Sequence, residues 1–137
     1  MEIFRVRNDE FFDLIEDVVE NEFFTESTGM DYKEAIRESF KINPESFFIL
    51  AAMDEEDEQI VAFSISSIPA QARNGFIEYL YYLPDYANTG QKMFDLTREW
   101  MKRKGRNRIQ TTTDRVDGEL LDNNSFQTLS VIVGEDI

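Results

Sequence analysis

The middle of the chain constrains its fold more than any other part. Residues 75–83 are rich in aromatic and aliphatic side chains and predict a strand, and residues 84–89 predict a loop. Residues 91–104 predict an amphipathic helix, and Gly105 suits the position after its C-terminus. Residues 108–113 predict a further strand. Two strands joined through a helix pair in parallel, so this unit predicts a helical crossover within a sheet.

Shorter patterns on either side complete the predicted order of elements. They are a strand at 3–7, a helix from Asn8 or Asp9 to about Phe24, a helix from Asp31 to before Pro44, and a hairpin with strands at 47–53 and 60–68. The order β-α-α-β-β-β-α-β predicts an α/β (α+β) fold, in which helices flank a mixed central sheet. A short variable tail follows. Within it, residues 117–123 fit a short helix, and residues 129–133 fit either a strand or the end of a helix.

The composition is that of a folded, water-exposed protein. The chain has 137 residues, of which 42% are hydrophobic and 13% aromatic, so residues 1–137 predict a single domain with a filled core. No apolar run approaches the roughly 18 to 20 residues that a membrane span needs, and the N-terminus lacks the pattern of a signal peptide. We therefore expect a cytoplasmic protein without a membrane partner.

The chain contains no cysteine and no histidine. These absences exclude a thiolate nucleophile, a Ser-His-Asp triad and any metal site built on Cys or His ligands. No metal site is expected. Proton transfer, if the protein is an enzyme, has to rely on carboxylates, hydroxyls or water.

The charge is distributed unevenly along this acidic chain, whose net charge is −14. Residues 1–60 hold 18 acids and 5 bases, whereas residues 61–110 hold 4 acids and 8 bases. The overall charge argues against nucleic acid as a partner. The basic middle fits a solvated helix face or a landing site for an anionic ligand, and both interpretations stay open.

Specific residues of the predicted crossover resemble those of the GNAT superfamily of acetyl-CoA-dependent N-acetyltransferases. Ile77, Leu80, Tyr81 and Pro84 fall on the family's Ile-x-x-Leu-Tyr-Val-x-Pro pattern, with Tyr82 in place of Val. The order of elements is also similar to that of the family. The resemblance covers nearly the whole chain in order, with motif-level detail in about 30 residues, as judged from the sequence alone.

The resemblance implies that acetyl-CoA is the cofactor and that residues 76–113 hold it. The pantetheine arm would pair with the backbone of Leu80, Tyr81, Tyr82 and Leu83. The pyrophosphate would lie at the start of the helix, because a helix N-terminus offers N–H groups and a partial positive charge. The residues implied at that end are Asn88, Thr89, Gly90, Gln91 and Lys92.

The pyrophosphate loop departs from the family pattern Arg/Gln-x-x-Gly-x-Gly/Ala. Residues 85–90 read Asp-Tyr-Ala-Asn-Thr-Gly, so Gly90 matches the last position and Asn88 replaces the first glycine. Asn tolerates a positive φ better than most residues do. Asp85 replaces Arg or Gln and would bring a carboxylate near the pyrophosphate, while Lys92 could restore positive charge.

Two residues are expected to take part in proton transfer. Glu78 lies on the strand implied to bind the cofactor and is the preferred general base, although an exposed carboxylate without a function is the alternative. The family often has a Tyr in its last helix that acts as a general acid. Asn123 and Gly134 have the spacing of the Asn and Gly that bracket this helix in the family, and this alignment puts Ser130 at the Tyr position, where it could orient a water. Asp114 is a second candidate base.

Three functions remain open at this stage. The first is an N-acetyltransferase that acts on a small-molecule or peptide amine, since the acidic N-terminal helices would attract a cationic acceptor. The second is a GNAT-like module that binds CoA or a protein without turnover, and the third is an acidic DNA mimic that binds basic partners. Only three residues follow Gly134, so we expect either that the hairpin that usually closes the family's sheet is missing, or that residues 126–133 are already a strand and the last helix is very short. A homodimer that completes the sheet is therefore a hypothesis.

Overall fold

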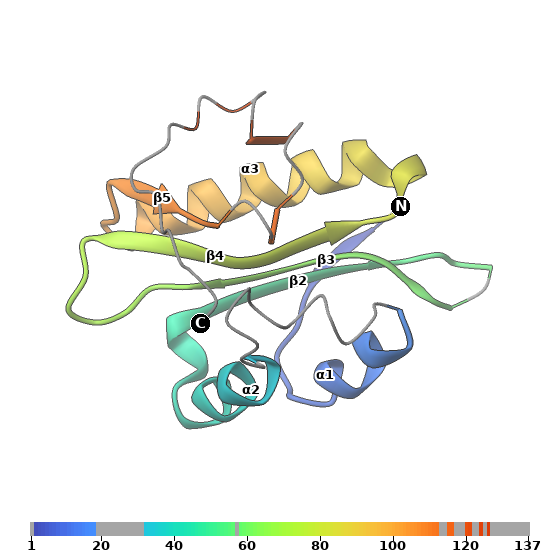
Figure 1. Cartoon of the computed structure of the whole chain (residues 1–137), viewed down its shortest axis with the longest axis horizontal. Coiled ribbons are helices and arrows are strands. Elements are labelled where there is room, and N and C mark those ends of the chain that lie inside the picture. The colour runs from blue at the N-terminus through green and yellow to red at the C-terminus, as the bar shows by residue number, and fades with distance from the viewer. Residues whose placement is uncertain are drawn as a thin grey trace, which may run out of the picture.

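The structure is a computed structural model, in which a five-stranded sheet separates two layers of helix (Figure 1). The described residues are 2–18, 32–56, 58–112, 115–116, 120–121, 124 and 126. The strands are β1 (Ile3–Arg5), β2 (Phe47–Met53), β3 (Ile60–Ser67), β4 (Asn74–Tyr82) and β5 (Arg108–Gln110). The mixed sheet and the element order confirm the predicted fold class.

The strands lie side by side in the order in which they follow along the chain. Neighbouring strands from β1 to β4 pair antiparallel, whereas β4 and β5 pair in parallel. The parallel pair is connected by α3 (Ala87–Arg103), which confirms the helical crossover. Gly105 follows this helix with a φ of 77°, the left-handed conformation that favours glycine after a helix end.

The two faces of the sheet carry different helices (Figure 1). α3 covers one face, and α1 (Phe11–Leu14) and α2 (Lys33–Ile42) cover the other. Short 3₁₀ turns at Ile15–Asp17, Pro44–Ser46 and Pro84–Tyr86 continue or connect these elements. None of the described helices has the length and apolar character that crossing a membrane requires.

Each face has its own hydrophobic core, because successive side chains of a strand point to opposite faces. Phe63, Ile65 and Tyr79 pack with Phe12 and Phe40 on the α1–α2 side. The core on the α3 side includes Phe48, Leu80, Met93, Phe94 and Trp100. Its best-defined aromatic contact joins sheet to helix, since the rings of Phe48 and Trp100 stack with centroids 5.0 Å apart.

Several predicted boundaries differ from the structure. α3 begins at Ala87 rather than Gln91, because Pro84 opens a 3₁₀ turn that leads directly into the helix. β5 ends at Gln110, short of the predicted Thr113. On α3, Leu96 is 45% exposed, whereas Phe94 and Thr97 are buried.

Other predictions fall partly beyond the described residues. The first helix was expected to reach about residue 24, and the described part runs from α1 through the 3₁₀ turn at Ile15–Asp17. Asp31, where the second helix was predicted to begin, lies outside the described residues, and α2 follows Tyr32 without a side-chain cap. In the tail, Leu120 and Leu121 are helical, in agreement with the short-helix prediction.

Candidate active site

A β-bulge in β4 lies at Glu78. Ile65 pairs with Tyr79 and Ser66 pairs with Ile77, so Glu78 is an extra residue between two regular pairs. A bulge bends its strand and redirects a side chain, and bulges are frequent beside active sites. Sequence reasoning placed Glu78 on the cofactor strand, and the structure adds the bulge that turns its side chain out of the regular alternation.

The Glu78 carboxylate is held by two donors. The Ser67 hydroxyl donates to Oε1 at 2.9 Å, and Nη1 of Arg115 donates to Oε2 at 3.2 Å. The Glu78 side chain is 26% exposed. Burial raises the pKa of the Glu78 carboxyl above its ordinary value, and the hydrogen bond from Ser67 opposes that rise. The nearby guanidinium also favours the ionised form.

Arg115 is the main residue that sequence reasoning missed. It is 8% exposed, and its guanidinium lies 5.1 Å from the ring centroid of Tyr32 and 5.0 Å from that of Tyr79. Both rings belong to the α1–α2 side of the sheet, so the cation is enclosed there next to Glu78. Burial lowers the pKa of Arg115. The sequence offered one signal that could have singled it out, because Arg115 is the only base among residues 111–137.

The regular parallel pairing between β4 and β5 is short. Parallel pairing covers only residues 74–76 of β4 and residues 108–110 of β5. Beyond it, the Thr111 hydroxyl donates to the carbonyl of Ile77 at 2.9 Å, and the carbonyl of Arg115 accepts from the N–H of Leu80 at 3.0 Å. The segment that contains Arg115 is therefore bound to β4 through both its main chain and its side chain.

Past the bulge, the backbone N–H and C=O groups of β4 point alternately toward β3 and toward the β5 side. The N–H of Leu83 donates to the carbonyl of Val61, so Leu83 and Tyr81 direct their backbone groups toward β3. By the same alternation, Leu80 and Tyr82 direct theirs toward the β5 side. Of the four residues expected to pair with pantetheine, only Leu80 and Tyr82 therefore direct their backbone groups away from β3, where a ligand could pair with them. The N–H of Leu80 is already bound to the carbonyl of Arg115.

The start of α3 supplies the other predicted binding region. Asn88 and Thr89 lie in its first turn, whose N–H groups have no acceptor within the helix. Asn88 is exposed, and Lys92 is exposed one turn further on. Both suit an anion at the positive end of the helix dipole, whereas the exposed Asp85 opposes one.

Gln91 and Gly90 make internal contacts. The side-chain amides of Gln91 and Asn124 exchange hydrogen bonds of 3.0 and 2.9 Å, which directs Gln91 toward the tail. Gly90 is buried, and a Cβ atom there would lie 2.4 Å from Cδ1 of the Tyr82 ring. Glycine is thus required at position 90 by close packing between α3 and β4, a reason that is independent of any phosphate.

Substituting Gly90 with alanine is expected to destabilise the protein by about 1–3 kcal/mol, because the added methyl group overlaps the Tyr82 ring. Urea denaturation measures the loss. The double variant Gly90→Ala/Tyr82→Ala removes the overlap, so its loss should be smaller than the sum of the two single losses. Strict additivity would show that Tyr82 is not the obstacle.

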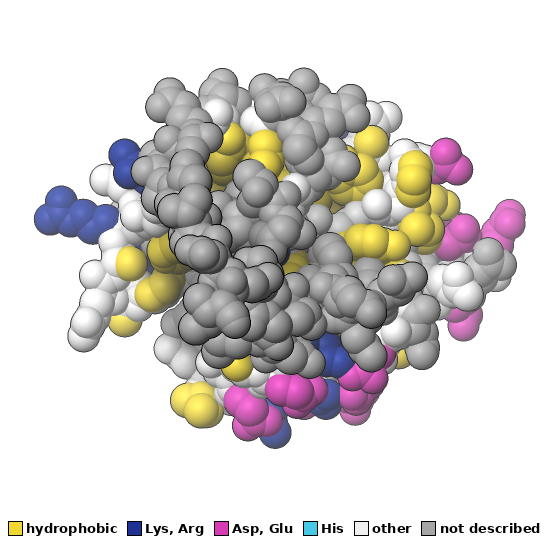
Figure 2. Space-filling view, viewed as in Figure 1, with side chains coloured by type: hydrophobic (Ala, Val, Ile, Leu, Met, Phe, Trp, Pro, Cys, Tyr) yellow, Lys and Arg dark blue, Asp and Glu magenta, His cyan; other side chains and the backbone are white. Residues whose placement is uncertain are grey.

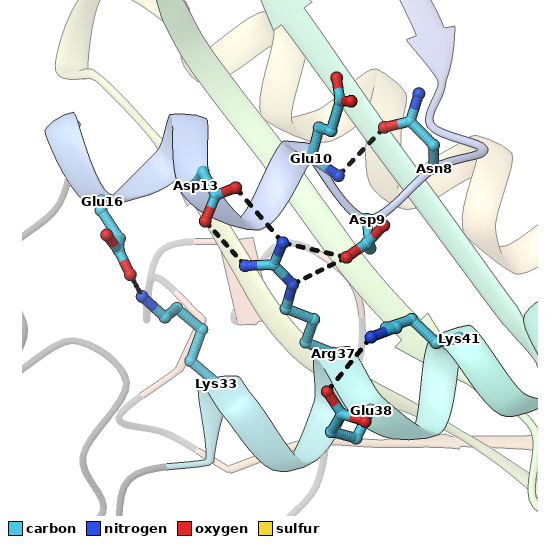
Figure 3. A network of polar contacts seen from close by, with 9 residues as sticks. All are labelled: Asn8, Asp9, Glu10, Asp13, Glu16, Lys33, Arg37, Glu38 and Lys41. Atoms are coloured by element: carbon cyan, nitrogen blue, oxygen red, sulfur yellow. Dashed lines mark hydrogen bonds and ion pairs between the residues drawn. The ribbon is translucent and has the colours of Figure 1, made fainter.

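The helices on the Glu78 side are joined by ion pairs (Figure 3). Nη2 of Arg37 on α2 lies 2.9 Å from Asp9, and its Nη1 lies 2.7 Å from Asp13 on α1. Lys33 binds Glu16 in the same way. These contacts raise the pKa of Arg37, and the hydrogen bond from Arg37 lowers the pKa of Asp13. The network fixes α2 against α1.

Acidic side chains remain exposed around this network. Figure 2 shows Asp and Glu gathered along the α1–α2 edge and at the tip of the β2–β3 hairpin. Lys and Arg also stand at the opposite end, where α3 ends. The acidic first part of the sequence therefore places exposed acids along the α1–α2 edge, where Lys and Arg side chains also lie among them.

The other predicted site residues cannot be placed. Ser130, Asp114, Asn123 and Gly134 lie outside the described residues. Within the described ranges, no group of three or more acidic, His or Cys residues could hold a metal ion.

Comparison with solved structures shows the fold. An aminoglycoside 6'-N-acetyltransferase, AAC(6')-IG from Acinetobacter haemolyticus, superposes with a TM-score of 0.66 at 16% identity, over 100% of this chain and 98% of that one. An acetyltransferase of Trypanosoma brucei gives 0.66 at 14% identity, over 99% of both chains. Glucosamine-6-phosphate N-acetyltransferase from Arabidopsis thaliana gives 0.65 at 12% identity, over 98% and 97%.

Sequence comparison identifies the family. No curated protein sequence matches this chain significantly. The statistical model of the acetyltransferase (GNAT) family, in contrast, matches residues 9–118, which include the bulged strand, the crossover helix and Arg115. The chain belongs to the GNAT acetyltransferase family.

Proposed function

We propose that this protein transfers an acetyl group from acetyl-CoA to a primary amine, with Glu78 as the general base. The observation that supports this most directly is the position of Glu78. Its carboxylate lies at a β4 bulge, just beyond the point where the regular parallel pairing of β4 with β5 ends. A base at that place borders both the strand edge proposed for the cofactor and the acidic helices proposed for the acceptor.

The described residues fit the cofactor in part. The first turn of α3, with Asn88 and Thr89, suits the pyrophosphate, as does Lys92 one turn later. The backbone of Leu80 and Tyr82 has the direction that pantetheine amides need. Binding at Leu80 requires its N–H to exchange the Arg115 carbonyl for a ligand acceptor. When bound, acetyl-CoA would supply an activated thioester.

Glu78 would act on the acceptor amine. An amine is protonated at neutral pH and attacks a carbonyl only as the neutral base, so a proton has to leave it. Glu78 accepts that proton as the new C–N bond forms and the C–S bond breaks. Ser130 is proposed to orient a water near the leaving thiolate.

The acceptor is proposed to be a cationic amine on a small molecule or peptide. The exposed acids over α1 and α2 favour a positively charged ligand. Solved structures with the same fold include enzymes named for aminoglycoside and glucosamine-6-phosphate acetylation, both of which use amine acceptors. A homodimer remains a separate hypothesis that light scattering can test.

Titration with acetyl-CoA by calorimetry is the first test, and we expect saturable heat and a raised melting temperature. A panel of amines, assayed by release of free CoA thiol, then tests turnover. Absence of both heat and thermal shift at millimolar acetyl-CoA would overturn the proposal.

One observation favours a second candidate, a module that binds CoA without turnover. The N–H of Leu80 is bound to the carbonyl of Arg115, and the guanidinium of the same residue pairs with Glu78. Both the cofactor edge and the base are thus engaged by one residue. Saturable binding of CoA, combined with no thiol release from any amine of the panel, would select this candidate.

A further inference from the structure

A single residue connects the two functional parts of the site. The main chain of Arg115 binds β4 at Leu80, and its side chain binds Glu78 two residues earlier on the same strand. The guanidinium is also enclosed between the rings of Tyr32 and Tyr79, which restricts its position. The side-chain contacts hold the Arg115 guanidinium beside the bulge, and they do not depend on the N–H of Leu80.

We propose, on the basis of the function proposed above, that Arg115 is a positioning residue that keeps the Glu78 carboxylate ionised and aimed toward the acceptor. Arg115 acts through Glu78 and is not itself proposed to touch the reacting atoms. A base can accept a proton only in its ionised form, and a half-buried carboxyl without a cation nearby favours the neutral form.

The surroundings of Glu78 make Arg115 the candidate for this role. From β3, Ser67 donates one neutral hydrogen bond to the carboxylate. From the start of α2 and from β4, the rings of Tyr32 and Tyr79 face the guanidinium. The cations of α2 pair with other carboxylates: Lys33 with Glu16, Arg37 with Asp9 and Asp13, and Lys41 with Glu38.

The geometry also explains how Glu78 is aimed. Each carboxylate oxygen accepts from a different donor, Oε1 from Ser67 and Oε2 from Arg115. Two donors on opposite oxygens fix the carboxylate plane more firmly than one hydrogen bond does, and a hydrogen bond to a charged group is stronger than a neutral one. Of the two donors to the carboxylate that the described residues supply, Ser67 alone would remain after the loss of Arg115.

The test measures the ionisation of Glu78 directly, without substrate. Carbon-13 carboxyl NMR of glutamate-labelled protein gives the pKa of Glu78 in the wild type, Arg115→Gln, Arg115→Met and Arg115→Lys. The resonance is assigned by its loss in Glu78→Gln. We expect the pKa to rise by about 1–3 units in the Gln and Met variants, and Lys to restore much of the difference because it keeps the charge.

Two features keep this test decisive. Met retains an unbranched stem that can fill the space between the two Tyr rings, so it provides a folded variant if Gln does not. Arg108→Gln, which removes an exposed cation of β5, is the matched control and should leave the pKa of Glu78 unchanged. An unchanged pKa in the folded charge-removing variants would overturn the inference.

The pH dependence of acetyl transfer supplies the second measurement. The acidic limb of kcat/KM should move to higher pH in Arg115→Gln by the same amount as the pKa of Glu78, and Arg115→Lys should reverse most of the shift. A purely structural role would lower activity equally at all pH values. If the wild type shows no transfer, the proposed function fails while the NMR titration still decides the role of Arg115 in ionising Glu78.

Discussion

Replacing Glu78 with glutamine is expected to lower kcat for acetyl transfer by about 10²- to 10⁴-fold, the usual contribution of a positioned general base. Glutamine keeps the size of the side chain and one oxygen, which can accept from Arg115, while its amide N–H can donate to the Ser67 hydroxyl, but it cannot take a proton. KM for acetyl-CoA should change little, because the side chain of Glu78 is not proposed to contact the cofactor. Steady-state assays of thiol release with a saturating amine measure both constants.

The wild type should show a matching dependence on pH. Burial raises the pKa of Glu78, so the proportion of ionised base falls as the pH is lowered through that raised value. The rate should therefore rise with pH on its acidic side and then level off once Glu78 is ionised. Glu78→Gln should lose this limb and keep only a low activity that does not depend on Glu78.

Glu99→Gln is the matched control, because it makes the same chemical change on the exposed face of α3, where Glu99 pairs with Lys102. This variant should retain wild-type kcat. Equal activity of Glu78→Gln and the wild type, with both folded by circular dichroism, would remove Glu78 from the mechanism. The search for a base would then move to Asp114 or to water.

The sheet was predictable because its signals are local. Strands β2 and β3 appear as two apolar runs on either side of an acidic turn, and the crossover appears as a helix period between two such runs. The start of α3 was predicted too late in the sequence, because the residues before Gln91 carry the local signals of a loop. Pro84, Asn88 and Gly90 are residues typical of loops, yet Pro also suits the first turn of a helix, and Gly90 is retained for its contact with Tyr82.

The site was only partly predictable, because its decisive contacts join residues far apart in sequence. Glu78 could be nominated from its place on a strand. Its partner Arg115 is 37 residues away, and no local period or motif connects the two. The pairing arises because the chain that follows β5 stays bonded to β4, at Ile77 and Leu80, and so brings Arg115 to the bulge. Contacts of this kind follow from the fold and were therefore missed in the sequence.

The largest expected effect on stability comes from Phe63, on the central strand β3. Its side chain is 0% exposed and lies between the α1–α2 layer and the site strand. Its ring contacts Phe11 edge-on at 5.7 Å between centroids and Tyr81 at 5.5 Å. Phe63→Ala removes the ring from the centre of this core, and surrounding elements that are fixed in a sheet can relax only in part. We expect a loss of about 3–5 kcal/mol in the free energy of unfolding.

Phe4→Ala makes the same chemical change at a position that is 40% exposed, on the edge strand β1, and should cost less than about 1 kcal/mol. Urea denaturation of both variants measures the difference. Because the total stability of a domain is about 5–15 kcal/mol, Phe63→Ala should also raise the unfolded fraction. Similar losses for Phe63→Ala and Phe4→Ala would mean that the α1–α2 core does not depend on Phe63, and that α1 is held mainly by the Arg37 ion pairs.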